Sequence, residues 1–229
     1  MRTYKVTDLL FCFQIPRMFY TITSSSAILL SLLLHLAFSR LVPLLQGLTA
    51  ARAWKLRNTA TSLFHSLAAG VWSTSLYSSS ISADLVSLTS PSCAALLAFS
   101  VGYFIHDTWD SASAQYRGVR PVTLESVVLL AHHAIVITCF STALISDQFV
   151  CLGGLSLLVE VNSVFLHGRT LVLLLGWPRD SIVFRTTALI NILTYCIFRL
   201  VLLSWMCLWM ASRRQQVLVQ GSRRIDRMG

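Results

Sequence analysis

Six long stretches of mostly apolar residues follow one another along the chain. A helix needs roughly 20 such residues to cross the hydrocarbon core of a bilayer. The pattern therefore predicts six spanning helices, at residues 25–45, 58–79, 91–109, 124–145, 149–176 and 181–211. The link SDQ between the fourth and fifth stretches is so short that we expect these two helices to be antiparallel neighbours.

Composition supports a location in the membrane. Of the 229 residues, 55% are hydrophobic and only 12% are charged, whereas roughly 25% of the residues in a soluble domain are charged. The net charge of +9 does not indicate a nucleic-acid partner, because basic residues of membrane proteins gather in loops that face the cytoplasm. The predicted fold is an all-α, multi-pass transmembrane helix bundle.

The basic residues of the connections fall on one side of this bundle. The first, third and fifth connections carry Arg52, Lys55, Arg57, Arg117, Arg120 and Arg179. The second and fourth carry none, so the odd-numbered connections are expected to face the cytoplasm and both termini the other side. The five arginines of the tail conflict with that orientation. Either one span is miscounted, or this tail differs from what usually follows a sixth span; we favour the second interpretation.

The chain divides into four parts by composition. These are an N-terminal segment at 1–24, a first span with its connection at 25–53, a main membrane domain at 54–211 and a basic tail at 212–229. The N-terminal segment contains the apolar stretch LLFCFQIP, which is too short to span. Arg17 interrupts the apolar core that a cleaved signal peptide needs, so we disfavour cleavage.

The six cysteines form no CxxC pair, and most of them lie in apolar stretches. Disulfide frameworks are typical of short secreted chains. We therefore expect these cysteines to act as small buried hydrophobic side chains.

Ionisable side chains interrupt the third and fourth spans. The third contains SVGYFIHDTWD, where His106 and Asp110 are four residues apart and share a helix face, while Asp107 is turned away by about 100°. The fourth contains His132 and His133, which face different directions because they are adjacent. A charge at the bilayer centre costs roughly 2.5–3.5 kcal/mol. These side chains are therefore expected to face a shared polar interior.

The fifth and sixth spans carry polar stripes as well. In the fifth, one stripe contains Glu160, Ser163 and His167, and a second contains Asn162 and Arg169. In the sixth, one stripe contains Asn191, Tyr195 and Arg199. A buried guanidinium without a partner is costly, so we expect Arg199 to pair with a carboxylate. Glu160 is the first choice and an aspartate of the third span is the second.

His132, His133 and Glu160 are the candidates for catalysis. A histidine that a carboxylate orients can take a proton or attack an acyl group. The other polar residues are candidates for lining a lipid site: His106, Asp107, Asp110, Asn162, His167, Arg169 and Arg199.

No HExxH-type spacing supports a metal site, and no cofactor is implied. We expect structural roles for the lone His35 and His65, and polar contacts between helices for Asn191, Ser163 and Thr138.

Four segments resemble the TLC-domain family, which includes the ceramide synthases. They are SVGYFIHDTWD, LAHHAIVIT, LSLLVEVNSVFLHGRTLVLL and FRLVLLSWMCLW. The resemblance runs from about Trp54 to Trp209 and is strongest to the small TLC domain-containing proteins linked to phospholipid composition and membrane fluidity. It implies a helix bundle around a lipid-accessible cavity, with a membrane lipid or acyl chain as partner. It also favours the plasma membrane, with the endoplasmic reticulum second.

The resemblance also bears on chemistry. In ceramide synthases a histidine of the pair works with aspartates of the next span. His132 and His133 match the pair, while Glu160 and Asn162 occupy the aspartate positions. This substitution disfavours acyl transfer to a sphingoid base, so the predicted function is regulation of phospholipid acyl composition and fluidity through lipid binding. An acyltransferase that uses the paired histidines is the alternative, and whether the protein is an enzyme stays open.

Two further expectations concern transport and the C-terminus. A transporter is disfavoured, because the sequence has no inverted repeat and no pair of broken spans in corresponding halves. Members of the subgroup usually continue with another apolar stretch after the SWMCLW region. The arginine-rich tail found there instead indicates an alternative or truncated terminus.

Overall fold

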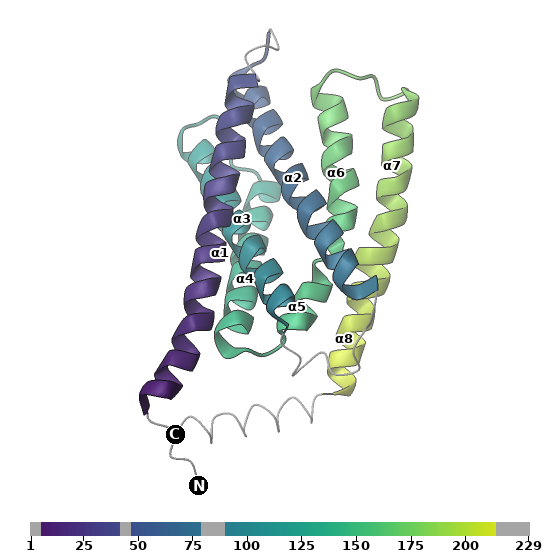
Figure 1. The fold of residues 1–229 in the computed structure, drawn as a ribbon. Coiled ribbons are helices and arrows are strands. Elements are labelled where there is room, and N and C mark those ends of the chain that lie inside the picture. Colours follow the sequence, from purple (N-terminus) through teal and green to yellow (C-terminus); the bar gives the residue numbers. More distant parts are fainter. Residues whose placement is uncertain (1–5, 42–46, 79–89, 214–229) are drawn as a thin grey trace.

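The computed structural model describes residues 6–41, 47–78 and 90–213. In this part of the chain all regular structure is helical, which confirms the predicted all-α class. The elements are α1 (Val6–Leu41), α2 (Ala50–Ser78), α3 (Pro91–Tyr116), α4 (Leu124–Ser146), α5 (Val150–Ser156), α6 (Val159–Leu174), α7 (Ile182–Thr194), η2 (Tyr195–Val201) and α8 (Leu202–Ser212). The long helices run up and down the bundle (Figure 1).

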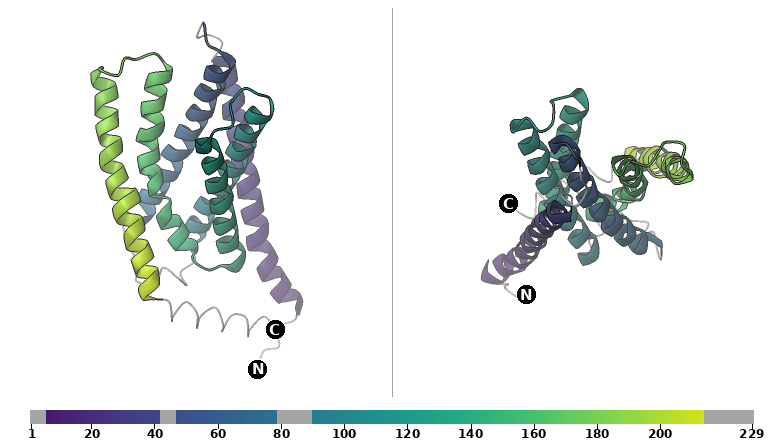
Figure 2. Two further views of the ribbon diagram at one scale, coloured as in Figure 1. Left: turned by 180° about the vertical axis from the view of Figure 1, so that it is seen from behind. Right: turned by 90° about the horizontal axis from the view of Figure 1, so that it is seen from above.

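α3 lies at the centre of the larger part of the bundle. It packs against α1, α2, α4 and α5, and its side chains Leu96 and Leu97 are fully buried. α6 and the continuous α7–η2–α8 form a hairpin that stands to one side, joined to the rest mainly where α6 packs on α2 (Figure 2). The expected pairing of the fourth and fifth spans is therefore only partly right, because α4 contacts α5 while α6 packs on α2 and α7.

The multi-pass membrane character is supported by the lengths of the helices. Four segments are long and apolar enough to cross a bilayer: Met18–Leu41, Leu124–Ser146, Val150–Leu174 and Ile182–Ser212. α2 and α3 have 29 and 26 residues, which corresponds to about 43 and 39 Å of helix. They are long enough for a core of roughly 30 Å but carry more polar residues than the other four. Those residues face neighbouring helices inside the bundle, as described below.

α1 begins much earlier than predicted. The expected first span started at residue 25, whereas the helix starts at Val6 and has 36 residues. The polar residues after Arg17 do not end it, because Thr21 Oγ1 donates to Met18 O at 2.8 Å and Thr23 Oγ1 donates to Phe19 O at 2.9 Å. Hydroxyls bonded back to the preceding turn can be accommodated within a helix. Residues 42–45, the expected end of this span, lie outside the described part.

The predicted fifth span is broken into two helices. At the junction, Leu157 N donates to Gly154 O and Glu160 N donates to Leu157 O, a tighter pattern than the α-helical one. The carbonyl oxygen of Gly154 also accepts a hydrogen bond from α2, because Ser73 Oγ donates to it at 2.9 Å. The predicted span over 149–176 corresponds to the membrane-length segment Val150–Leu174, but its helix is interrupted between α5 and α6. The break sets α6 on a path toward α2.

Three connections meet at one end of the bundle. α1, α3 and α6 end there, and α2, α4 and α7 begin there (Figure 1). We call it the basic end, because it holds the six basic residues assigned to the odd-numbered connections: Arg52, Lys55, Arg57, Arg117, Arg120 and Arg179. The first three lie in the first turns of α2 rather than in the connection before it, where the sequence had predicted them. The arginines of the tail after Arg213 lie outside the described residues.

Candidate functional site

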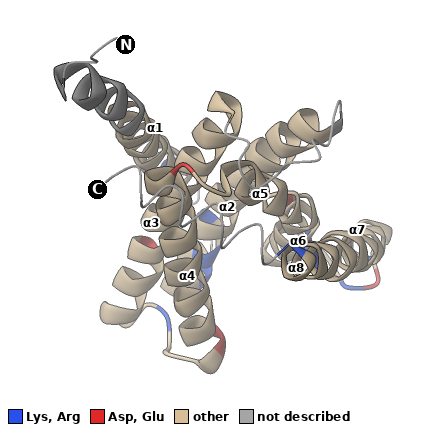
Figure 3. Ribbon diagram, turned by 90° about the horizontal axis from the view of Figure 1, so that it is seen from below, with Lys and Arg blue, Asp and Glu red and all other residues tan. Residues whose placement is uncertain are grey.

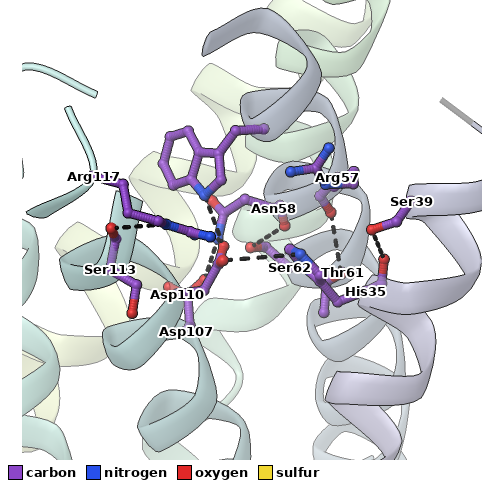
Figure 4. A network of polar contacts seen from close by, with 11 residues as sticks. His35, Ser39, Arg57, Asn58, Thr61, Ser62, Asp107, Asp110, Ser113 and Arg117 are labelled. Atoms are coloured by element: carbon purple, nitrogen blue, oxygen red, sulfur yellow. Dashed lines mark hydrogen bonds and ion pairs between the residues drawn. The ribbon is translucent and has the colours of Figure 1, made fainter. Parts of the chain in front are cut away.

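Two aspartates of α3 are held together by α2. Asn58 Nδ2 donates to Asp107 Oδ1 at 2.6 Å and to Asp110 Oδ2 at 3.3 Å, and Trp54 Nε1 donates to Asp110 Oδ2 at 3.0 Å. All four side chains are buried. Figure 4 shows Asn58 facing both carboxylates across the contact between the helices. Because every carboxylate oxygen left without a donor in an apolar interior is costly, these bonds are what allow both acids to sit there.

Histidines from two other helices approach the same acids. His133 Nδ1 of α4 lies 3.5 Å from Asp107 Oδ2, and His35 Nε2 of α1 lies 3.9 Å from Asp110 Oδ1. The ring of His106 is 5.9 Å from that of His35. His106 and Asp110 thus share the α3 face that meets α1, while Asp107 is turned toward α2 and α4, as predicted. We call this group, with Trp54 and Asn58, the aspartate cluster.

The aspartate cluster lies close to the basic end. Asp107 is nine residues from the end of α3, which corresponds to about 13 Å of helix. The charges of Lys55 and Arg120 act on Asp107, and the Arg120 guanidinium carbon lies 5.3 Å from the Trp54 ring centre. Long basic side chains near helix ends can reach the membrane surface. The cluster is therefore a group of buried polar side chains close to the end that carries the positive charges, rather than an isolated site at the bilayer centre.

The two adjacent histidines of α4 have different surroundings. His133 is buried against Asp107, whereas His132 is exposed on the outer face of the helix. Val128 and Ile135, one turn before and one turn after His132, are also exposed. The ring centres of the two histidines are 5.8 Å apart. The prediction that they face different directions is confirmed.

A second polar group lies deeper along α6, at its contact with the last helices. Asn162 Nδ2 donates to Asn191 O at 2.9 Å and to Thr194 Oγ1 at 3.1 Å. Arg199 Nε donates to Asn162 Oδ1 at 2.8 Å, and Arg199 Nη2 donates to Ser163 Oγ at 3.1 Å. We call these five residues the Arg199 cluster. Arg199 itself lies in the π-helical segment η2, a type of irregularity that is frequent at functional sites.

Arg199 does not make the ion pair that the sequence predicted. Its described partners are an amide and a hydroxyl oxygen, and the described ion pairs of the bundle are both between a histidine and an aspartate. Glu160 precedes Asn162 by two residues and is therefore turned away by about 200°. It faces α2, where Ser66 Oγ donates to Glu160 Oε2 at 2.6 Å. The Arg199 charge still acts on Glu160, but through space rather than by contact.

The structure also changes the partners of the histidine pair. Matching to ceramide synthases suggested Glu160 as the carboxylate for His132 and His133, but the carboxylate beside His133 is Asp107 of α3. The hydrogen bond of Glu160 goes to α2. His167 is half-buried on α6, where the charges of Lys55 and Arg199 act on it.

Sequence reasoning missed the contribution of α2 and α1. Asn58, Ser62 and Ser66 are spaced by four residues and are all buried, so their spacing was a usable signal for a polar helix face. His35 was expected to be a lone structural histidine, yet it belongs to the aspartate cluster. Within the described residues, no group of three His, Cys, Asp or Glu side chains is arranged to hold a metal ion.

Comparison with known proteins assigns the family. Residues 55–223 match the TLC domain. TLC domain-containing protein 2 of Danio rerio is 36% identical over 172 residues, covering 74% of this chain and 67% of that protein. The Homo sapiens protein of the same name is 38% identical over 173 residues, covering 74% of this chain and 62% of that protein. TLC domain-containing protein 1 of Homo sapiens is 32% identical over 152 residues, covering 65% of this chain and 58% of that protein.

The match covers only part of each relative. It spans between 58% and 67% of the lengths of these three proteins. No solved structure matches the chain. The match to the TLC domain extends over most of the chain and includes the histidine pair, both aspartates and the Arg199 cluster, so this membrane protein belongs to the TLC-domain family.

Proposed function

We propose that this protein binds a phospholipid beside α4 and regulates the acyl composition of membrane phospholipids, and through it membrane fluidity. One observation carries the proposal: an exposed histidine, His132, stands next to the buried pair of His133 and Asp107. The family of the chain and the membrane-spanning lengths of its helices are consistent with a lipid ligand.

The surroundings of His132 support a lipid as the ligand. His132 is eight residues from the start of α4, which corresponds to about 12 Å of helix. It forms no hydrogen bond with any described residue, although a polar group in hydrocarbon is costly without one. A lipid ester or hydroxyl group could supply that partner. The exposed Val128 and Ile135 on either side would contact the acyl chain.

A second candidate function is acyl transfer. His133 beside Asp107 has the arrangement of a base and the carboxylate that orients it. In that mechanism His133 removes the proton of an acceptor hydroxyl or amine and Asp107 stabilises the charged imidazole, while His132 contacts the substrate. The observation that favours this function over passive binding is the position of His133 Nδ1, which lies 3.5 Å from Asp107 Oδ2 and 3.5 Å from Thr108 Oγ1.

The regulatory proposal is tested in cells that lack this protein and its relatives. Wild type, His132→Ala and Thr138→Ala are expressed at equal membrane levels, and phospholipid acyl composition is measured by mass spectrometry. Thr138 is the matched control, because it is exposed on α4 and its hydroxyl bonds only to Ala134 O of the same helix. We expect wild type and Thr138→Ala to shift the composition and His132→Ala to leave it at the null profile. If wild type causes no shift, the proposal is wrong.

The enzymatic alternative needs a separate experiment. The full chain is purified in lipid nanodiscs and incubated with labelled acyl-CoA and a series of lysophospholipid and sphingoid-base acceptors. A labelled product that disappears in His133→Gln identifies an acyltransferase. Wild-type protein that shifts cellular lipid composition but forms no product with any acceptor acts as a regulator.

We propose the plasma membrane as the site of action, with the endoplasmic reticulum as the alternative. We base this on the likeness to the small TLC domain-containing proteins. The chain is 38% identical to TLC domain-containing protein 2 of Homo sapiens over the matched residues. Imaging of the full chain with a fluorescent tag against markers of both membranes tests it. Signal confined to the endoplasmic reticulum would contradict the first choice.

A further inference from the structure

Two cysteines that are far apart in the sequence face each other at the end of the bundle opposite the basic end. Cys93 is in the first turn of α3 and Cys151 is in the first turn of α5. Their Sγ atoms are 3.0 Å apart, and both residues are buried. Since an S–S bond is about 2.05 Å long, the sulfurs need to approach by only about 1 Å more to be joined. We propose that Cys93 and Cys151 form a disulfide that links α3 to α5.

The other described cysteines do not share this arrangement. Cys139, Cys196 and Cys207 are exposed on apolar helices, whereas the sequence predicts buried side chains. Cys93 and Cys151 are 58 positions apart, so only the packing of α3 against α5 brings them together. The proposed disulfide thus departs from the expectation that the cysteines serve only as small buried side chains.

Tyr77 of α2 holds the two cysteines in place. Its hydroxyl lies 3.5 Å from Cys93 Sγ and donates to the carbonyl oxygen of Cys151. Gly154 leaves room for this ring, because a Cβ at that position would lie 2.8 Å from the Tyr77 hydroxyl and 3.7 Å from Cys93 Sγ. Side chains of α2, α3 and α5 thus meet at the two sulfur atoms, and this packing restricts the rotation of both thiols.

The position of the pair along the bundle places it on an oxidising side. α3 and α5 both begin at the end away from the basic residues (Figure 1). Figure 3 shows the bundle from this end, where α5 packs against α3. By the positive-inside rule this end faces the lumen or the outside of the cell. Disulfides form and persist in those compartments, whereas cytosolic thiols are kept reduced.

The chemistry is an ordinary thiol–disulfide exchange. The thiolate of one cysteine attacks the disulfide of a luminal thiol–disulfide oxidoreductase and forms a mixed disulfide, and the thiolate of the second cysteine then displaces the enzyme. Each cysteine loses one proton, and the two electrons reduce the oxidoreductase to its dithiol. Because both sulfurs are buried in the folded protein, this exchange belongs to folding, before α2 closes over them. Afterwards the same burial protects the bond from reduction.

Differential labelling of the full chain tests the disulfide. A variant in which Cys12, Cys139, Cys196 and Cys207 are replaced by serine retains only the proposed pair. Cells that express it are lysed in denaturant with N-ethylmaleimide, and the protein is then reduced and labelled with a maleimide polymer. We expect two polymer tags per chain, and none when reduction is omitted. No tag after reduction, or one tag from a mixed disulfide with another molecule, would overturn the proposal.

Two controls keep the result interpretable. A variant that retains only Cys139 and Cys196 should gain no tag on reduction, since those thiols are exposed and unpaired with each other. Because the serine variants could fold poorly, the wild-type chain is also digested without reduction and analysed by mass spectrometry. A linked peptide pair that contains Cys93 and Cys151 supports the proposal. Wild-type protein in which either residue carries N-ethylmaleimide throughout contradicts it.

Discussion

Asn58 is the residue that lets two carboxylates share the interior of the bundle. Its one amide nitrogen donates to Asp107 and to Asp110, and both acids lie between apolar helices. Two carboxylates so close together repel each other when both are charged. An amide that donates to both reduces this repulsion, and the histidines on the far side of each acid add a further partner.

Exchanging the amide and one acid tests this arrangement. Asn58→Ala should lower the free energy of unfolding by about 1–3 kcal/mol, because two buried acceptors lose a donor. Asn58→Asp should cost more, since it adds a third carboxylate. In the double variant Asn58→Asp with Asp107→Asn, an amide again faces an acid, so part of the loss should be recovered. The thermal unfolding midpoint in detergent measures all three variants. A double variant that is less stable than Asn58→Asp would contradict the assignment.

The contact between Arg199 and Asn162 is predicted to be energetically coupled. Arg199→Leu, Asn162→Leu and the double variant form a cycle, and residues in one hydrogen-bond network typically couple by about 0.5–3 kcal/mol. The control cycle combines Arg199→Leu with Thr138→Ala, because the Thr138 hydroxyl is exposed on α4 and bonds to Ala134 O of its own helix. We expect a smaller coupling there. Denaturant titration in detergent micelles measures the free energy of unfolding of each variant. Equal coupling energies in both cycles would contradict the predicted coupling between Arg199 and Asn162.

At the scale of helices, the crossing of α1 over α3 depends on a glycine. A Cβ on Gly102 would lie 2.8 Å from Ala27 Cβ and would collide with the carbonyl oxygen of Ser24. Near this crossing, Ser24 Oγ donates to Ala98 O at 2.9 Å. Small residues are typical of contacts between membrane helices, because they let the backbones approach closely.

A pair of glycine substitutions separates this packing role from helix propensity. Gly102→Ala should destabilise the protein by about 1–3 kcal/mol through overpacking and weaken the attachment of α1. Gly168→Ala is the matched control on α6, since its Cβ would meet only Thr187 Cγ2 at 3.8 Å. It should be neutral or stabilising, because alanine is a better helix former than glycine. The thermal unfolding midpoints of both variants are measured. If Gly102→Ala and Gly168→Ala change the midpoint equally, the close crossing of α1 and α3 is contradicted.

At the scale of the whole molecule, the positive-inside rule predicts that the two ends of the bundle face different compartments. The basic end carries six basic residues, three of them in the first turns of α2, and the link between α4 and α5 at the other end carries none. The aspartate cluster then lies on the cytoplasmic half of the membrane, and the cysteine pair on the opposite side. Arg213, at the end of α8, lies at the end of the bundle opposite the basic end and opposes this prediction.

Epitope insertion tests this orientation. A tag at Gly118, in the connection between α3 and α4, should be reached by antibody only after the plasma membrane is selectively permeabilised. A tag at Gln148, between α4 and α5, should be reached only from the lumen or the outside. A third insertion point in SISADLVS lies outside the described residues but is expected to behave like Gln148. Reversed accessibility would overturn both the orientation and the oxidising location of the cysteines.

The sequence by itself determined the helices, their polar faces and the side of the bundle on which the basic connections lie. These features depend on local rules: the length of a span, the 3.6-residue period and the charge of the connections. The different orientations of the adjacent His106 and Asp107 followed from their spacing, and so did the split between His132 and His133. The polar face of α2 at Asn58 and Ser66 was readable in the same way.

Only the tertiary structure decided which side chains meet. Asp107 rather than Glu160 stands beside His133, Arg199 binds Asn162 rather than a carboxylate, and Cys151 reaches Cys93 because α5 breaks away from α6. Each of these contacts depends on which helices are neighbours and on how far one is shifted along another. A periodic pattern fixes the direction of a side chain around its own helix but contains no information about the helix that it will face. That information comes from packing, in which close crossings such as the one at Gly102 set the position of each helix.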